Sequence, residues 1–135
     1  MDPVGELERR FMPLLEGLCG RLAGRYPGCR FSVYSHAVGS ATCYQGHDVG
    51  LECVMPDAPP DRADNVALSI GLMHLTSEPR IASAGVAWGA DGSHPDVDLE
   101  LIGEPAPFSI AALGDLEREF SRLAAVLEQA VGTWR

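Results

Sequence analysis

The chain contains no lysine: all ten of its basic residues are arginines, set against 19 aspartates and glutamates, for a net charge of −9. Nucleic-acid backbones and anionic membrane surfaces attract clustered cations, so this charge balance argues against direct binding to either. An acidic protein suits a basic protein partner, because opposite fields accelerate their encounter, although acidity also simply keeps a protein soluble. The charge therefore favours a basic protein partner, with neither nucleic acid nor membrane as a ligand; self-association is the other partner we consider.

Long hydrophobic runs are also missing, since none approaches the roughly 20 residues of a membrane span. The first residues, Met1 to Glu6, have neither the basic start nor the apolar stretch of a signal peptide. We therefore expect a cytoplasmic protein. A length of 135 residues, 46% of them hydrophobic, allows one sizeable core but not two comfortable ones, so residues 1–135 are expected to form a single domain.

Paired-cysteine motifs of metal or redox sites are absent. The four cysteines, Cys19, Cys29, Cys43 and Cys53, include no Cys-x-x-Cys pair, which is the spacing typical of zinc ribbons and redox motifs. In a reducing compartment they are expected to stay as thiols. We predict no cofactor and no metal.

Two segments have the period of amphipathic helices. In the N-terminal segment, apolar residues recur at spacings of three and four: Val4, Leu7, Phe11, Leu14, Leu15, Leu18 and Leu22. Pro13 lies inside this stripe and lacks a backbone N–H, which predicts a kink or a break. The C-terminal segment has the same period from Ile110 to Trp134, with Ser109 as its expected N-cap and Asp115 as the alternative start.

Five segments between these helices alternate with a period of two, which is typical of strands with one buried and one exposed face. They lie at residues 30–36, 48–55, 66–73, 80–88 and 96–101. No helical pattern separates them, which favours an antiparallel meander, and a tight turn is expected at Gly39-Ser40 between the first two. The expected fold class is α+β: a two-layer sandwich in which a five-stranded, mostly antiparallel meander carries the N-terminal and C-terminal helices on one face, in the order α-β-β-β-β-β-α.

If both helices cover the apolar face, the opposite face is the one left for binding. Its small residues would let the backbone of a partner approach closely, and Tyr34 and Trp88 are candidate aromatic anchors beside it. The predicted binding residues on this face are Asp48, Glu52, Ser69, Gly71, Asp96, Asp98 and Glu100.

Three groups of residues have the types needed for metal binding or catalysis, and each also has a simpler explanation. His36, Cys43, His47 and Cys53 lie close in sequence, but only Cys43 and His47 have the short spacing of a zinc pair. Cys43 with His47 or His36 also has the residue types of a thiolate–imidazole pair, with Asp48 to orient the base. No arginine lies between Arg30 and Arg62 to lower the pKa of the thiol.

The third arrangement is the run of acidic residues Asp96, Asp98 and Glu100, which has the spacing of a cation or acid–base site. It equally suits a strand edge that is protected by charge, and we favour that explanation.

No catalytic constellation emerges, so the leading hypothesis is a small acidic protein-binding module, such as an immunity or inhibitor protein or an escort chaperone for a basic partner. The alternative is a small-molecule-binding domain or enzyme with a pocket between the sheet and the helices. A structural dimer formed through the open sheet face is the third possibility.

Overall fold

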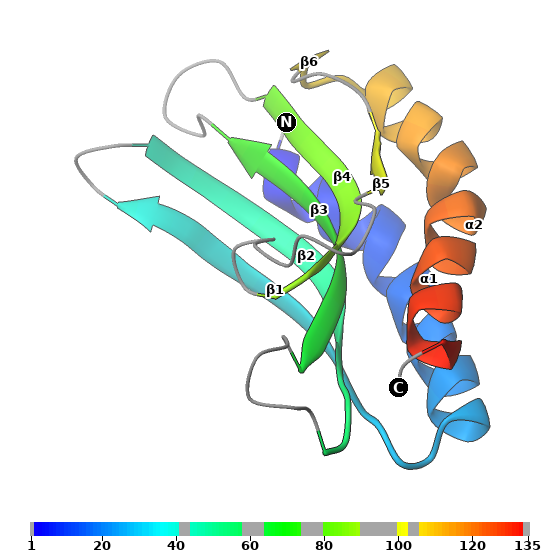
Figure 1. The fold of residues 1–135 in the computed structure, drawn as a ribbon. Helices are drawn as coiled ribbons and strands as arrows, with labels where there is room; N and C mark the ends of the chain where they lie inside the picture. The colour runs from blue at the N-terminus through cyan, green and yellow to red at the C-terminus, as the bar shows by residue number, and fades with distance from the viewer. Residues whose placement is uncertain are drawn as a thin grey trace.

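The computed structural model describes residues 2–40, 44–57, 64–73, 80–89, 100–102 and 106–133. It is an α+β fold in which one helix precedes and one helix follows an antiparallel sheet in the sequence. The elements are α1 (Pro3–Arg25), β1 (Arg30–Ser40), β2 (Tyr44–Val54), β3 (Asn65–Met73), β4 (Arg80–Trp88), β5 (Glu100–Ile102), β6 (Ala106–Pro107) and α2 (Ile110–Gly132). Figure 1 shows both helices on the same side of the sheet.

The four long strands form the predicted antiparallel meander in the order β1-β2-β3-β4. The prediction of five such strands is wrong in this detail, because two short segments, β5 and β6, both pair with β4 where one fifth strand was expected. The described pairing on this edge of β4 is confined to Glu100–Ile102 and Ala106–Pro107, and Pro107 has no N–H to donate to a ladder. Residues 96–99 of the predicted fifth strand lie outside the described residues.

The first hairpin is longer than the sequence indicated. We expected a tight turn at Gly39-Ser40, but both residues belong to β1, where Gly39 is opposite Gln45 and Ser40 is opposite Tyr44. Gly39 has a φ of 97°, a left-handed conformation that glycine adopts without steric cost.

Each helix presents one apolar stripe to the sheet. α1 buries Leu7, Phe11, Leu15, Leu18 and Leu22. It continues through Pro13, which lies on the exposed side of the helix, where water can reach the carbonyl that loses its hydrogen bond. α2 begins as predicted at Ser109, whose side-chain oxygen accepts a hydrogen bond from the amide of Ala112 at 3.0 Å.

The core lies between the helices and one face of the sheet. α1 packs on β1 and β2, α2 packs on β3 and β4, and the rings of Phe11 and Phe120 lie 6.5 Å apart where the helices meet. Val49 and Leu51 on β2, and Leu68 on β3, are fully buried in this layer. The alternate residues of these strands therefore point away from the helices, and we call the surface they form the outer face.

Candidate functional site: the outer face of the sheet

Cross-strand pairing brings an aromatic residue, a histidine and a carboxylate together on the outer face. Tyr34 of β1 is directly opposite Gly50 of β2, and His36 is directly opposite Asp48. Side chains at such positions have their Cβ atoms roughly 5 Å apart. The three side chains therefore form one group, which we call the Tyr34–His36–Asp48 cluster.

The Tyr34 side chain extends from β1 across the neighbouring strand β2 to β3. Its hydroxyl group lies over Gly50 and is hydrogen-bonded to Ser69, which is opposite Gly50 on β3. A Cβ at position 50 would overlap both the Tyr34 hydroxyl and the carbonyl oxygen of Leu68. Gly50 is thus required by close approach, and the aromatic side chain shields the backbone that the glycine leaves bare.

Burial raises the pKa of Tyr34 to about 12, and the negative charge of Asp48 acts in the same direction. The hydrogen bond with Ser69 opposes this shift. The phenol is therefore a neutral group at physiological pH, held in one position by Gly50 and Ser69.

His36 stacks on Tyr34. The ring centroids are 4.7 Å apart and the ring planes are inclined by only 16°. His36 is exposed and Tyr34 is partly buried, so the stack extends from the surface of the sheet to the solvent. Two parallel rings present a planar π surface beside the carboxylate of Asp48.

Asp48 is a partly buried carboxylate without a basic partner among the described arginines. Its neighbours on the outer face include Gly46 and Gly50 on its own strand and Gly71 opposite it on β3. Burial raises its pKa, while the nearby His36 and His47 partly offset the shift. The charged form of Asp48 is therefore held in a less favourable environment than water provides.

The remaining predicted binding residues divide into three groups. Glu52, Ser69 and Gly71 share the outer face with Asp48, and Glu52 accepts a weak hydrogen bond from Asn65 at 3.4 Å. Asp96 and Asp98 lie outside the described residues. Glu100 is opposite Val86 of β4.

The sequence only partly indicated the aromatic members of the cluster. Tyr34 was a candidate anchor and lies on the outer face, but Trp88 is 4% exposed and belongs to the core. His36 was considered only for metal or catalytic chemistry. A signal for the cluster was present in the glycines at positions 46, 50 and 71, which mark places where another group approaches the backbone closely.

The residues of the hypothetical zinc site do not converge. His36 lies on the outer face, whereas Cys53 is fully buried in the core and Cys43 lies outside the described residues. His47 lies at a position with the parity of the buried face, next to Ser35. Within the described part of the chain, no group of three or more histidine, cysteine or acidic side chains has the arrangement of a metal site.

Ser35 links α1 to the sheet through a chain of hydrogen bonds. Its hydroxyl donates to Glu8 Oε2 at 2.8 Å and lies 2.7 Å from His47 Nε2. Since the hydroxyl proton points to Glu8, His47 Nε2 is the donor to Ser35 Oγ. In this arrangement the histidine cannot act as the base that activates Ser35, and the chain serves to attach the helix.

The described thiols are poorly suited to nucleophilic chemistry. Burial raises the pKa of Cys53 to about 12, with smaller contributions from Cys29 and Cys19. Burial also raises the pKa of Cys29, whose Sγ lies 3.9 Å from the Met55 sulfur. Thiolates are the reactive form of cysteine, so both residues are packing residues here.

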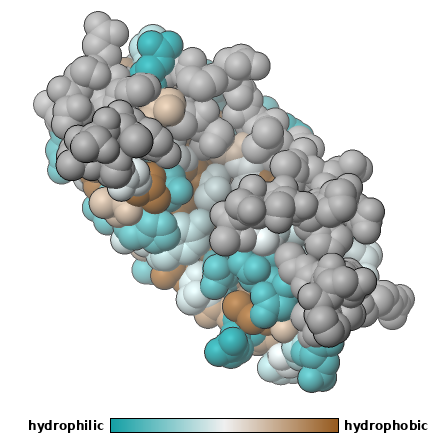
Figure 2. Space-filling model, turned by 60° about the vertical axis from the view of Figure 1, so that its left-hand side comes forward, coloured by the Kyte–Doolittle hydropathy of each residue, from teal (hydrophilic) through white to brown (hydrophobic). Residues whose placement is uncertain are grey.

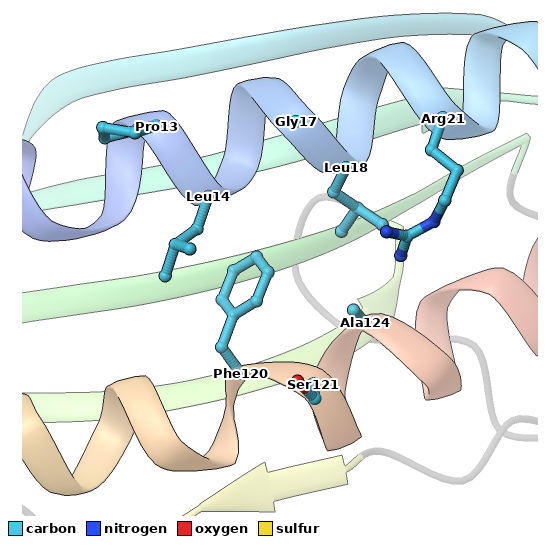
Figure 3. Close-up of a pocket in the computed structure, with 8 residues that line it drawn as sticks. All are labelled: Pro13, Leu14, Gly17, Leu18, Arg21, Phe120, Ser121 and Ala124. Atoms are coloured by element: carbon cyan, nitrogen blue, oxygen red, sulfur yellow. The ribbon is translucent and has the colours of Figure 1, made fainter.

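Apart from the outer face, a groove lies between the two helices, on the side away from the sheet (Figure 3). It has a volume of about 400 Å³. Leu14, which is 38% exposed, and Phe120 project into it, and Arg21 is the charged residue among the described residues that line it. This groove is not the pocket between sheet and helices that the alternative hypothesis requires, and its lining includes no histidine, cysteine or carboxylate.

Charge is distributed unequally between the helices and the rest of the chain. The sequence of α1 and α2 contains seven acidic residues and six arginines, whereas residues 26–109 contain eleven acidic residues and only three arginines. Every ion pair that joins two described side chains lies within or between the helices. Figure 2, in which the side away from the helices is turned forward, shows hydrophilic side chains mixed with isolated hydrophobic ones.

The chain matches no known family model, no curated protein and no solved structure. In the part of the chain that the structure describes, neither helix is long and apolar enough to cross a membrane.

Proposed function

We propose that this protein binds a basic protein partner through the outer face of its sheet. The observation that carries the proposal is the segregation of charge: five of the seven carboxylates of the helices are paired with arginines, whereas Asp48 and Glu52 form no ion pair with a described arginine. Complementary charge steers partners together and discriminates against wrong ones. An immunity or inhibitor protein and an escort chaperone, both acting in the cytoplasm, would each use such a face.

The environment of Asp48 supports a binding role over a structural one. A carboxylate that stabilises the fold through an ion pair has a lowered pKa, but the pKa of Asp48 is raised because burial disfavours its charge. Residues that oppose stability are characteristic of functional surfaces, where activity is retained at the expense of the fold. An ion pair with a cationic partner would offset the desolvation of the Asp48 carboxylate.

Self-association through this face is less favourable. In a two-fold symmetric dimer the same patch is used by both copies, so a face with unpaired carboxylates meets another of the same sign. Like charges brought together at an interface oppose binding. The charge of the outer face thus favours a different, basic protein over a second copy.

Two charge-matched double variants test the proposal. Asp48→Asn with Glu52→Gln removes two charges from the outer face, and Asp115→Asn with Glu119→Gln removes two from α2. Binding of octa-arginine and octa-lysine peptides is measured by fluorescence anisotropy at low and high salt. The outer-face variant should lose about tenfold in affinity, equivalent to 1.4 kcal/mol, and the helix variant much less.

Equal losses in the two variants would show that binding depends only on net charge, and the outer face would be rejected as the site. Circular dichroism of both variants verifies that the fold is retained. The affinity of the wild-type protein should fall with added salt, because the charges involved are close to the solvent.

A further inference from the structure

We propose that the Tyr34–His36–Asp48 cluster is an anchor site for an arginine side chain of the partner, with the guanidinium bound to Asp48 and lying against the stacked rings. This inference rests on the proposed function and specifies the chemistry by which the basic partner is recognised. It distinguishes arginine from lysine, which a general acidic surface does not.

The first element of the site is a partly buried carboxylate among glycines. Asp48 is flanked on β2 by Gly46 and Gly50 and faces Gly71 on β3. None of these glycines has a side chain that stands beside the carboxylate, and Asp48 forms no hydrogen bond with another described side chain. Tyr34 covers Gly50 and a methyl group of Val38 lies over Gly46, so a planar group from a partner would approach Asp48 from the side of the exposed His36 ring, which is opposite it.

The second element is the aromatic surface. The nearly parallel rings of Tyr34 and His36 are held 4.7 Å apart, and the exposed His36 ring is the outer member of the stack. Guanidinium groups are planar and stack on aromatic faces, which an ammonium group cannot do. Because His36 is opposite Asp48, a guanidinium next to the ring is also next to the carboxylate.

The third element is desolvation. Asp48 is partly buried, and its raised pKa shows that it has already lost water. A guanidinium is more weakly hydrated than an ammonium and offers two parallel N–H donors to one carboxylate. An arginine therefore loses less hydration on entering this site than a lysine, and gains a bidentate hydrogen bond.

The experiment compares octa-arginine with octa-lysine, which carry equal charge, on the wild-type protein and on single variants. Wild type should bind octa-arginine about tenfold more tightly than octa-lysine. Asp48→Asn should bring this ratio close to one. His36→Ala changes an exposed side chain and should lower octa-arginine affinity about threefold while leaving octa-lysine affinity unchanged. Glu52→Gln, the matched control, should weaken both peptides by the same factor.

Each outcome decides a different claim. If both peptides bind and the ratio is the same in wild type, Asp48→Asn and His36→Ala, the arginine anchor is wrong while binding through the outer face stands. If the wild-type protein binds neither peptide at low salt, the proposed function fails together with the anchor. Retained thermal unfolding transitions in Asp48→Asn and His36→Ala exclude unfolding as the cause of any loss.

Discussion

On the two helices, carboxylates lie beside arginines: Arg10 contacts Glu117, and Arg25 lies 2.5 Å from Glu128, so that both pairs connect α1 with α2. On the outer face, Asp48 and Glu52 have no such partner among the described arginines. Both surfaces carry acidic residues, but only on the helices do described arginines form ion pairs with them. Arg30, exposed on β1, and Arg80, on β4, form none with another described side chain. The comparison shows that net charge alone does not locate a binding surface; the distribution of counter-charges does.

The largest difference between the two regions is expected for glycine substitutions. Gly50→Ala introduces a Cβ that overlaps the Leu68 carbonyl and the Tyr34 hydroxyl, and should destabilise the protein by about 1–3 kcal/mol. Gly20→Ala, in α1, places its Cβ in open space and should stabilise the protein by about 0.5–1 kcal/mol. Chemical denaturation of both variants measures the difference, and similar changes in the two would mean that Gly50 is not sterically required.

A smaller contrast is expected when one carboxylate is neutralised in each region. Glu117→Gln removes a partner of Arg10 and should lower the free energy of unfolding by up to about 1 kcal/mol. Asp48→Asn should instead raise the melting temperature at neutral pH, because the charged form of Asp48 is disfavoured in the folded protein.

The pH dependence of the Asp48→Asn effect follows from the raised pKa. Below the ordinary aspartate pKa, the carboxyl is protonated in both the folded and unfolded states, so the variant gains nothing. The gain should appear as pH rises past that value and level off above the folded pKa of Asp48. Melting curves across this range test the sign, and a variant that is less stable at neutral pH would contradict it.

The smallest effect is spectroscopic. Tyr34, with a pKa of about 12, should ionise later than an ordinary tyrosine as alkali is added. Its folded pKa is raised, so the stability it contributes should decline as pH increases from the usual tyrosine pKa toward 12. Ultraviolet titration follows the phenolate, and Tyr34→Phe should remove the late component. If that variant retains it, the late component belongs to another tyrosine.

The sequence predicted the local features of the fold well. Alternation along β2 and β3 separated Val49, Leu51 and Leu68, which are buried, from Asp48, which is not, because successive side chains in a strand point to opposite faces. Ser109 was recognisable as an N-cap since capping depends on residues only three positions apart. Both features depend on residues that are only a few positions apart, so the sequence alone is enough to recognise them.

The features that the sequence did not predict depend on pairing between distant residues. The position of Tyr34 over Gly50, and of His36 beside Asp48, is set by the register of β1 against β2, and the hairpin turn was expected in a different place. The Glu8–Ser35–His47 connection likewise joins three separate elements. Alternation fixes the face of a residue, but it does not identify the residues across from it.

The contact between Tyr34 and Gly50 also determines how this protein can be re-engineered. The Tyr34 hydroxyl occupies the space that a side chain at position 50 would need, so a substitution at either position alters strand pairing as well as recognition. His36 is the exposed member of the cluster, and Glu52 lies partly exposed beside the cluster on the same surface. A library intended to redirect the protein to new partners should therefore vary positions 36 and 52 and keep Tyr34 and Gly50 constant.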